Sequence, residues 1–426
     1  MDIKEKAYNL LREWKGDNYV FGRGVLNQVG MVARKYGETT LVISNLTYMK
    51  SVADEVVSYL REAGVKIAGD TVAPDAKPNA PREDVYRLVT YILQYKPDSI
   101  VAIGGGSTID ACKCASALAS LGKEVTPEVD HYFGTNVVST ELERTGKKLI
   151  PVIAVETSAS SGAHLTKYSN ITDPVVGQKK LIVDEAIIPA TSIFDYDITA
   201  TMPVKVTIDG ALDAIAHTFE VFCGQKGEKY ELAKDLAITA ISLCCENAKK
   251  LVENPKDLEA REAIGLATDL GGYAIMIGGT SGAHLTSFSL VDVVGHGTAC
   301  GIMNPFYAVL YSKAIQKQLK AVGEVFAKYG YADSSIVELN DRALSIGVAK
   351  AMIEYGKSIN APTSLNELEG FGEKHIQRAL NAAKDPQLKM KLQNMPVPMT
   401  VEDVDKFMEP VLRGASIGDL DLVIEM

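Results

Sequence analysis

Four side chains in the second half of the chain have residue types and spacing that could hold a divalent metal ion. Asp213 and His217 lie four residues apart in an apolar stretch of helical periodicity, 207–222, so they project from one face about a turn apart. This pair alone favours a simpler structure, an Asp–His hydrogen bond packed at a domain junction. His284 and His296, however, lie in a Gly-rich, apolar region where a buried histidine needs a partner. One Asp and three of the chain's six His would complete a four-ligand site with room for a substrate.

A glycine-rich turn, GGGSTID at 104–110, is the second candidate site. It follows a buried apolar run, 99–103, and precedes a helix-like stretch in which Ser107 and Asp110 have the spacing of a capping box. Glycines before a helix N-terminus let backbone N–H groups approach a phosphate, and the helix dipole favours the anion. The motif lacks the GxGxxG spacing of the ordinary dinucleotide fingerprint. We therefore predict phosphate binding here, with a tight turn as the alternative.

A loop of small hydroxyl residues follows another predicted strand, 149–155. The loop, 156–162, reads ETSASSG, and hydroxyl groups at the carboxyl end of a strand suit hydrogen bonds to a cofactor. On this segment alone, a capped turn is the simpler interpretation. The polar residues before the strand, 121–148, are predicted to form an irregular loop.

The elements that must position these side chains change in character along the chain. In the first part, β-branched runs such as 39–44 alternate with helix-like stretches such as 82–95, the pattern of a parallel α/β sheet. Helical periodicity then takes over in five stretches, 209–224, 228–253, 257–278, 305–329 and 335–358. The sequence predicts an α/β domain with a parallel sheet over 1–197 and an all-α domain over 198–426. Asp213 and His217 should then face the cleft between the domains.

The length, charge and cysteine content limit which classes of protein this chain can belong to. A chain of 426 residues is too long for one ordinary core and suggests two domains. The net charge of −10 argues against nucleic acid or an anionic membrane as the main partner. No apolar run approaches the length of a membrane span, and the start of the chain has no signal-peptide core. The six Cys show no paired framework, so buried free thiols are expected rather than disulfides or zinc ligands, in a cytoplasmic protein.

Together, these motifs resemble a known family, the iron-containing (group III) alcohol dehydrogenases of the glycerol dehydrogenase and dehydroquinate synthase superfamily. The resemblance covers nearly the whole chain, and its specificity lies in the order and spacing of pieces that are weak singly. The pieces are YVFGRG (19–24), PNA (78–80), GGGSTIDACK (104–113), the loop 157–162, ITD (171–173) with Lys179, IVD (182–184), GALDAIAH (210–217), His284 with His296, INAPTSL (359–365) and MTVEDV (399–404).

The resemblance implies a dehydroquinate synthase-like fold with a dinucleotide-binding α/β domain and a helical metal domain, in a homodimer or larger homo-oligomer. The family's metal ligands, which are its catalytic residues, fall on Asp213, His217, His284 and His296. Its cofactor-binding positions fall on Asn79, Gly105, Gly106, Ser107, Asp110, Thr157, Ser158, Ser161 and Lys179. The family's NAD-selecting aspartate is matched by Asn45, which does not repel a 2′-phosphate, so NADP is permitted and NAD is not excluded.

Several positions depart from the family's pattern. Phe288 stands where the family usually has a histidine near the nicotinamide, often with a proton-handling role. The separation of His284 from His296 is also shorter than usual. Asp292, four residues before His296, is a candidate second-shell partner or substitute ligand. In the cofactor loop, the family's acidic residue becomes His164 and its proline becomes Glu156.

The reaction expected is reversible hydride transfer between a small alcohol or aldehyde and nicotinamide, with Fe²⁺ or Zn²⁺ as the metal. Because Phe288 cannot carry a proton, the proton should leave through water or the cofactor ribose. Two other functions stay open. One is a superfamily relative with different NAD and metal chemistry on a phosphate-bearing substrate. Such an enzyme would need Lys or Arg around the metal to hold the phosphate, and 207–222 and 280–304 contain neither. The other is a nucleotide-binding protein that has lost catalysis.

Overall fold

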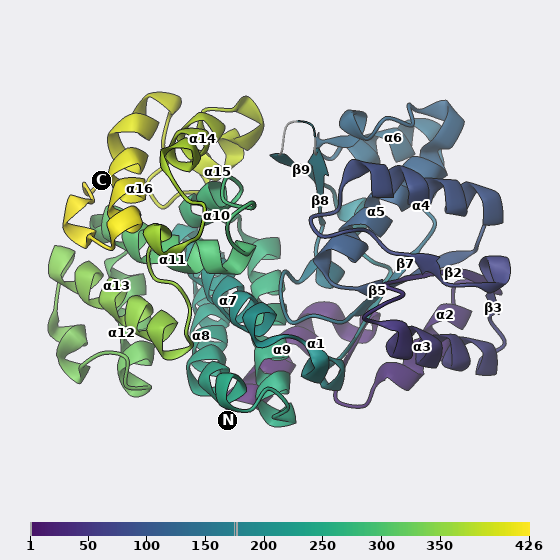
Figure 1. Cartoon of the computed structure of the whole chain (residues 1–426), viewed down its shortest axis with the longest axis horizontal. Coiled ribbons are helices and arrows are strands. Elements are labelled where there is room, and N and C mark those ends of the chain that lie inside the picture. The colour runs from purple at the N-terminus through teal and green to yellow at the C-terminus, as the bar shows by residue number, and fades with distance from the viewer. Residues whose placement is uncertain (1, 174, 176–177) are drawn as a thin grey trace. The chain divides into compact units, whose positions relative to one another are not determined.

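The computed structural model describes residues 2–173, 175 and 178–426. The chain divides into two compact units, Arg12–Thr201 and a second unit made of Met1–Leu11 with Met202–Met426 (Figure 1). The first unit is an α/β domain and the second is helical. Within the described residues, no helix combines the length and the apolar composition that crossing a membrane requires.

The α/β unit is built on a seven-stranded sheet in the order β1-β10-β7-β5-β2-β3, with β4 paired to β2. Each of these pairings is parallel, as the alternation of strand-like and helix-like runs predicts. The strands are β1 (Tyr19–Gly22), β2 (Thr39–Ser44), β3 (Lys66–Ile67), β4 (Ala73–Pro74), β5 (Ser99–Gly104), β7 (Val152–Glu156) and β10 (Thr191–Asp195).

Helices cover both faces of this sheet, because successive strand residues point to opposite sides. Leu41 and Ile43 of β2 pack with α4 (Arg82–Tyr95) and α5 (Gly106–Leu121), above the sheet in Figure 1. Val42 packs on the other face, with α2 (Val29–Arg34) and α3 (Lys50–Glu62). The central strands are therefore buried on both sides, which explains their continuous apolar runs.

The carboxyl ends of β2, β5 and β7 lie side by side, and α5 begins at this edge. The register pairs Ser44 with Ile103 and Gly104 with Glu156. The capping box predicted for Ser107 and Asp110 is wrong. The N-cap of α5 is Gly105, without a side-chain cap, so Ser107 lies within the helix, and its hydroxyl accepts a hydrogen bond from the backbone N–H of Asn79 instead.

A smaller sheet with the order β6-β9-β8 completes this unit. It contains β6 (Gly134–Thr135), β8 (Tyr168–Asp173) and β9 (Gln178–Val183), with β8 and β9 antiparallel. The irregular loop predicted over 121–148 is partly wrong, because α6 (Val137–Thr145) forms within it. This helix buries one side chain fully, Val138, so its apolar periodicity is too weak to mark it in the sequence.

The helical unit is centred on three long helices that pack against one another: α7 (Val204–Gly224), α8 (Tyr230–Glu253) and α9 (Leu258–Ile277). Two further helices pack near α7, the short α10 (Gly282–Ser287) and α11 (His296–Leu310). The remaining helices are α12 (Gln316–Lys328), α13 (Asp341–Ser358), α14 (Glu373–Ala383), α15 (Lys389–Gln393) and α16 (Glu409–Ile417). The first part of α1 (Ile3–Lys15) belongs to this unit, where Lys4 pairs with Glu259 and Glu262.

A glycine allows α11 to begin directly against α7. A Cβ atom on Gly297 would lie 2.0 Å from the carbonyl oxygen of Asp209 and 2.7 Å from the Cβ of Asp213. The Asp209 carboxylate accepts hydrogen bonds from the backbone N–H and the hydroxyl of Thr298, both at 2.8 Å. The two helices are therefore held in contact at the residues that carry Asp213 and His296.

Candidate metal and cofactor sites

Asp213 and His217 lie on one face of α7, as their spacing predicts, and both are buried. The His217 Nε2 atom is 3.7 Å from Oδ1 of Asp213, which is too long for a hydrogen bond. The simpler alternative for this pair, a packed Asp–His hydrogen bond, is therefore not what the structure contains. The two groups face each other across a gap instead.

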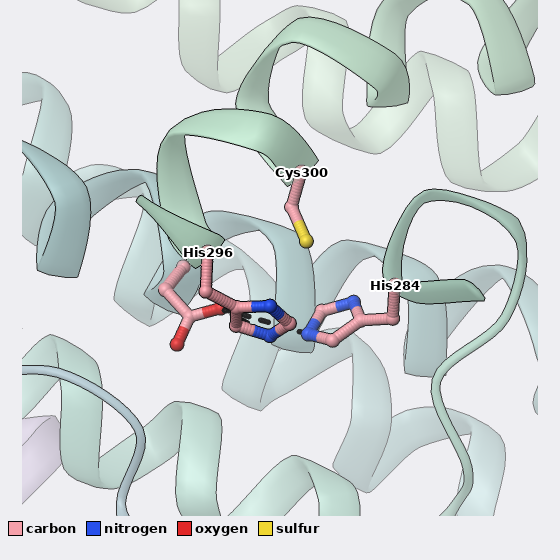
Figure 2. Close-up of side chains that lie close together, drawn as sticks. His284, His296 and Cys300 are labelled. Carbon is pink, nitrogen blue, oxygen red and sulfur yellow. Dashed lines mark ion pairs between the residues drawn. The ribbon is translucent and has the colours of Figure 1, made fainter. Parts of the chain in front are cut away.

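His284 and His296 close around the same carboxylate oxygen. Their Nε2 atoms lie 3.6 Å and 3.8 Å from Oδ1 of Asp213, so three imidazole nitrogens surround one oxygen at nearly equal distances. Ligands that share one four-coordinate ion, at bond lengths of about 2.1 Å, lie about 3.4 Å from one another. Figure 2 shows His284 and His296 reaching this point from α10 and α11.

Two of these buried atoms have no hydrogen-bond partner among the described residues, Oδ1 of Asp213 and Nε2 of His284. A buried polar atom without a partner costs about 1–3 kcal/mol, so a cluster of them needs an explanation. A divalent cation would satisfy both atoms at once, and imidazole with carboxylate suits Fe²⁺ or Zn²⁺. The residues present therefore fit the metal that the sequence predicts.

Hydrogen bonds on the other side of two of the rings, those of His284 and His296, turn their Nε2 atoms toward Asp213. His284 Nδ1 lies 2.6 Å from Oε1 of Glu220, whose Oε2 accepts from the backbone N–H of Ser281 at 2.7 Å. His296 Nδ1 lies 3.0 Å from the Ser287 hydroxyl. Such outer partners fix the ring orientation and the tautomer of a metal-ligating histidine.

Glu220 was not among the predicted site residues. Burial raises the pKa of its carboxyl, but the His284 imidazole and the Ser281 N–H lower it more, so the pKa lies below its ordinary value. Glu220 is thus a buried carboxylate that holds a proton on Nδ1 of His284. Glu220 lies one turn beyond His217, between apolar residues on both sides in the sequence, and this is a signal that could have found it.

A cysteine completes the group of candidate ligands. The ligand atoms of Asp213, His284, His296 and Cys300 all lie within 4.8 Å of one another. Figure 2 shows the Cys300 sulfur directed from α11 toward the histidine rings. The six cysteines are buried and free, as predicted, but Cys300 was not predicted to lie at the metal site. It follows His296 by one helical turn, so both point from the same face of α11.

Phe288 and Lys391 lie beside this cluster. The Phe288 ring stacks on His296 at a centroid distance of 5.9 Å, and the Lys391 Nζ atom lies 5.5 Å from the Phe288 ring centroid. Asp292 does not serve as a second-shell partner or substitute ligand, because it forms ion pairs with Arg378 and, at 3.3 Å, with His375. Lys391 comes from a distant part of the chain, and no spacing or motif in the sequence predicts its position here.

The predicted cofactor residues gather at the carboxyl ends of β5 and β7. A Cβ atom on Gly105 would lie 2.4 Å from the Ser158 hydroxyl, and one on Gly106 would lie 2.5 Å from the Ser161 hydroxyl. The Ser107 hydroxyl accepts a hydrogen bond from the backbone N–H of Asn79 at 3.0 Å. The glycine turn and the hydroxyl loop therefore line one small region at the start of α5.

Three other predicted cofactor residues have different surroundings. The buried Asp110 carboxylate accepts hydrogen bonds from the backbone N–H and side-chain amide of Asn170, so it ties α5 to β8. Lys179 lies on β9, and its positive charge acts on Asp110. Thr157 is buried, and its backbone N–H donates to Glu156.

The two cofactor-loop residues that depart from the family's pattern, Glu156 and His164, contact each other. His164 Nδ1 lies 3.0 Å from Oε2 of Glu156, and the Tyr19 hydroxyl lies 3.2 Å from His164 Nε2. The other Glu156 oxygen accepts from the backbone N–H groups of Thr157 and Ser158 and from the Ser158 hydroxyl. Glu156 and His164 therefore replace the family's residues as a buried pair that holds the loop in shape.

Asn45, which the resemblance matches to the family's NAD-selecting aspartate, directly follows β2. Its side-chain oxygen accepts from the backbone N–H groups of Thr47 and Tyr48, at 3.0 Å and 2.8 Å. Its amide donates to Asp75 at 3.4 Å, and the Thr108 hydroxyl donates to the other Asp75 oxygen at 3.1 Å. Burial raises the pKa of Asp75, a carboxyl at this edge that was not among the predicted site residues.

Comparison with known proteins identifies the family. The model of the iron-containing alcohol dehydrogenases matches residues 16–196, and the model of the C-terminal region of the same family matches residues 207–412. The chain belongs to the iron-containing alcohol dehydrogenase family. It is accordingly an oxidoreductase of the alcohol dehydrogenase type, as the sequence motifs predict.

Members of this family with curated names differ in cofactor and substrate. The chain is 28% identical to an NAD-dependent methanol dehydrogenase of Bacillus methanolicus, over 92% of this chain and 97% of the relative. It is 27% identical to an NADPH-dependent butanol dehydrogenase of Clostridium saccharobutylicum, over 82% of this chain and 84% of the relative. Relatives of both cofactor types are thus similar to the chain, and their names do not decide between NAD and NADP.

Solved structures of alcohol dehydrogenases share the fold. An archaeal alcohol dehydrogenase from a Red Sea brine pool superposes with a TM-score of 0.79 at 24% identity, covering 93% of this chain and 96% of the other. The NADH-dependent butanol dehydrogenase A of Thermotoga maritima gives a TM-score of 0.77 at 23% identity, with 94% and 96% coverage. The predicted fold class, a parallel α/β domain followed by a helical domain, is confirmed.

Proposed function

We propose that the protein transfers hydride reversibly between a small alcohol or aldehyde and the nicotinamide of NAD or NADP, with one divalent metal held by Asp213, His217, His284 and His296. One observation carries this proposal. Three imidazole Nε2 atoms lie 3.6 to 3.8 Å from a single buried carboxylate oxygen that has no hydrogen-bond partner among the described residues. A bound Fe²⁺ or Zn²⁺ would act as a Lewis acid that polarises a carbonyl oxygen and favours the deprotonated form of an alcohol.

The chain's own residues prepare the ligands for that ion. Glu220 accepts a hydrogen bond from Nδ1 of His284, which directs Nε2 toward the ion site. Burial lowers the pKa of His284, but Cys300, Glu220 and Asp213 raise it more, to well above its ordinary value, so a bound cation would replace the proton on Nε2. Burial lowers the pKa of His217 to about 4, which keeps this ring neutral and able to bind a cation at neutral pH. The surrounding side chains are mostly buried, and a dry site strengthens each electrostatic interaction within it.

The cofactor is proposed to bind at the glycine turn. Backbone N–H groups of Gly105, Gly106 and Ser107 at the start of α5 would hold the pyrophosphate, with Asn79 beside them. Further contacts are assigned to Thr157, Ser158, Ser161, Asp110 and Lys179. Asn45 is placed at the ribose, where a neutral amide accommodates either NAD or NADP.

Proton transfer needs a group other than residue 288. Phe288 has no titratable atom, and it fills the space beside His296 with an apolar ring. We propose that water or a cofactor ribose hydroxyl carries the proton in this protein.

A direct test combines metal analysis with a turnover screen. We expect the purified protein to contain about one Fe²⁺ or Zn²⁺ per chain and to oxidise NADH or NADPH when short aldehydes are added. Asp213→Ala should lose both the metal and the turnover while its circular dichroism spectrum stays native. Bound cofactor without turnover on any aldehyde would instead support a nucleotide-binding protein that has lost catalysis.

Three further parts of the prediction remain proposals. We propose that residues 1–197 bind the dinucleotide and residues 198–426 hold the metal. A homodimer or larger homo-oligomer is proposed from the family resemblance, and sedimentation velocity would test it. A cytoplasmic location stays a prediction from the sequence.

A further inference from the structure

Lys391 on α15 is a buried ammonium with few partners. Among the described residues, it donates one hydrogen bond, to the hydroxyl of Thr280, and no carboxylate lies within ion-pair distance of it. Lys113, which is also buried, differs: it donates to three backbone carbonyls and lies 3.7 Å from Asp110. A lysine ammonium has three donors. Lys391 therefore has donor capacity that this protein's own atoms do not use.

The unused N–H donors of Lys391 lie beside the candidate metal centre. Its Nζ atom lies 5.5 Å from the Phe288 ring centroid, and that ring stacks on the candidate ligand His296. Its hydrogen-bond partner Thr280 directly precedes Ser281, whose N–H binds Glu220. A molecule whose oxygen lies among the ligands could extend along Phe288 and end near Lys391.

The nearby acid does not neutralise Lys391 by direct contact. The Glu220 charge acts on Lys391, but the Glu220 oxygens are occupied by His284 and Ser281. Burial lowers the pKa of Lys391 to about 8, so the group is largely protonated at neutral pH. A buried charge without a paired opposite charge is unfavourable, and a methionine would pack in the same space without that cost. An anionic ligand would supply the missing partner.

We propose that Lys391 is an anion-binding subsite of the substrate pocket, and that the protein's own substrate is a small alcohol or aldehyde with a carboxylate or similar oxyanion at its far end. This inference rests on the proposed alcohol dehydrogenase function and names its substrate class. Phe288 would form the apolar wall along the substrate's carbon chain. In the family's usual arrangement, a titratable histidine stands at the position of Phe288.

The test compares two aldehydes that differ in the terminal group. For the metal-loaded protein with saturating NADH or NADPH, kcat/KM should be higher for 4-oxobutanoate than for butanal. Lys391→Met should lower the ratio of these two values about 10-fold or more, since a hydrogen bond to a charged group is worth about 1.5–3 kcal/mol. Most of the change should be in KM for 4-oxobutanoate, and butanal should be little affected. Lys391→Arg, which keeps the positive charge, should retain part of the preference.

Lys389 provides the matched control, because it is an exposed lysine on the same short helix. Lys389→Met should leave the substrate ratio unchanged. Binding of succinate, measured by titration calorimetry on the metal-loaded protein, gives a readout without turnover and should also be lost in Lys391→Met. If Lys391→Met changes neither the ratio nor succinate binding, the subsite is refuted. If the wild type binds succinate through Lys391 but reduces neither aldehyde, the proposed reaction fails while the subsite stands.

Discussion

At the scale of single residues, the candidate metal centre consists of two i,i+4 pairs from different helices and one further histidine. Asp213 and His217 project from α7, and His296 and Cys300 project from α11. Each pair uses the same property of the α-helix, that residues one turn apart share a face. His284 then enters from α10, with Glu220 fixing its ring.

Cys300 offers the site a sulfur donor in addition to the four predicted ligands. Without an ion, burial raises the pKa of its thiol to about 11, but a coordinated thiol loses its proton to solvent. We expect Co²⁺-substituted protein to show a sulfur-to-metal charge-transfer band in the near ultraviolet. X-ray absorption of the zinc form should show one metal–sulfur distance of about 2.3 Å.

Two serine variants separate this prediction from a general effect of losing a thiol. Cys300→Ser should abolish the charge-transfer band and the sulfur scattering, whereas Cys245→Ser, at another buried cysteine of the same unit, should keep both. Nitrogen and oxygen scatterers alone in the wild-type protein would show that Cys300 lies near the ion without binding it. A protein that binds no metal at all would instead contradict the whole proposed centre.

The buried charge of Lys391 should also affect stability. Its pKa is about 8 in the folded protein and 10.5 in the unfolded chain, so the unfolded chain binds more protons between these pH values. The stability of the wild type should therefore rise with pH across this window. Lys391→Met removes the buried charge, and its free energy of unfolding at pH 7 should exceed that of the wild type by at most about 3 kcal/mol.

Denaturant unfolding of metal-free protein at several pH values would measure this difference. The advantage of Lys391→Met should be fully present below about pH 8 and should shrink as the pH rises toward 10.5. A difference that stays constant with pH would mean that the pKa of Lys391 is the same in the folded and the unfolded protein, so that its charge is not left unpaired by burial. That outcome would weigh against its role as an anion-binding group.

At the scale of elements, the site depends on how closely α11 approaches α7. Gly297→Ala would place a methyl group 2.0 Å from the Asp209 carbonyl oxygen, so α11 would have to move away from α7. His296 would move with it and leave the ligand group around Asp213. We expect a loss of stability of about 1–3 kcal/mol and at least a 10-fold weaker metal affinity.

Gly372 is a suitable control for this substitution, because a Cβ atom there would meet no other atom within 4 Å. Gly372→Ala should leave both metal affinity and unfolding midpoint near the wild-type values. If Gly297→Ala binds metal as tightly as the wild type, contact between the two helices does not set the ligand geometry.

The same elements show what the sequence could and could not predict. The parallel sheet and the pairing of Asp213 with His217 follow from local periodicity, which a sequence displays directly. The capping box at Ser107 was wrong because α5 begins at Gly106, before Ser107, and the side chains of Ser107 and Asp110 bond to Asn79 and Asn170 from distant parts of the chain. Cys300 was missed although it follows His296 by one helical turn, the same spacing as Asp213 and His217. Lys391 was missed because only the tertiary fold brings α15 to the other ligands.

At the scale of the whole molecule, the proposed metal and cofactor sites belong to different compact units. The candidate ligands all lie within Met202–Met426, whereas the glycine turn, the hydroxyl loop and Asn45 lie within Arg12–Thr201. Each unit has its own buried core. A ligand stabilises the structure that it binds, by about 4 kcal/mol at a concentration 1,000 times its dissociation constant.

We therefore expect metal and cofactor to protect different parts of the chain. In hydrogen–deuterium exchange, removal of the metal with a chelator should speed exchange in α7, α10 and α11 and leave β5, β7 and α5 nearly unchanged. Addition of NAD or NADP to the metal-free protein should slow exchange at the start of α5 and in the loop after β7. Asp213→Asn should respond to the cofactor but not to the chelator. Equal changes in both units on removal of the metal would show that they unfold as one cooperative structure, and protection of α7 by the cofactor alone would contradict the assignment of the two sites to separate units.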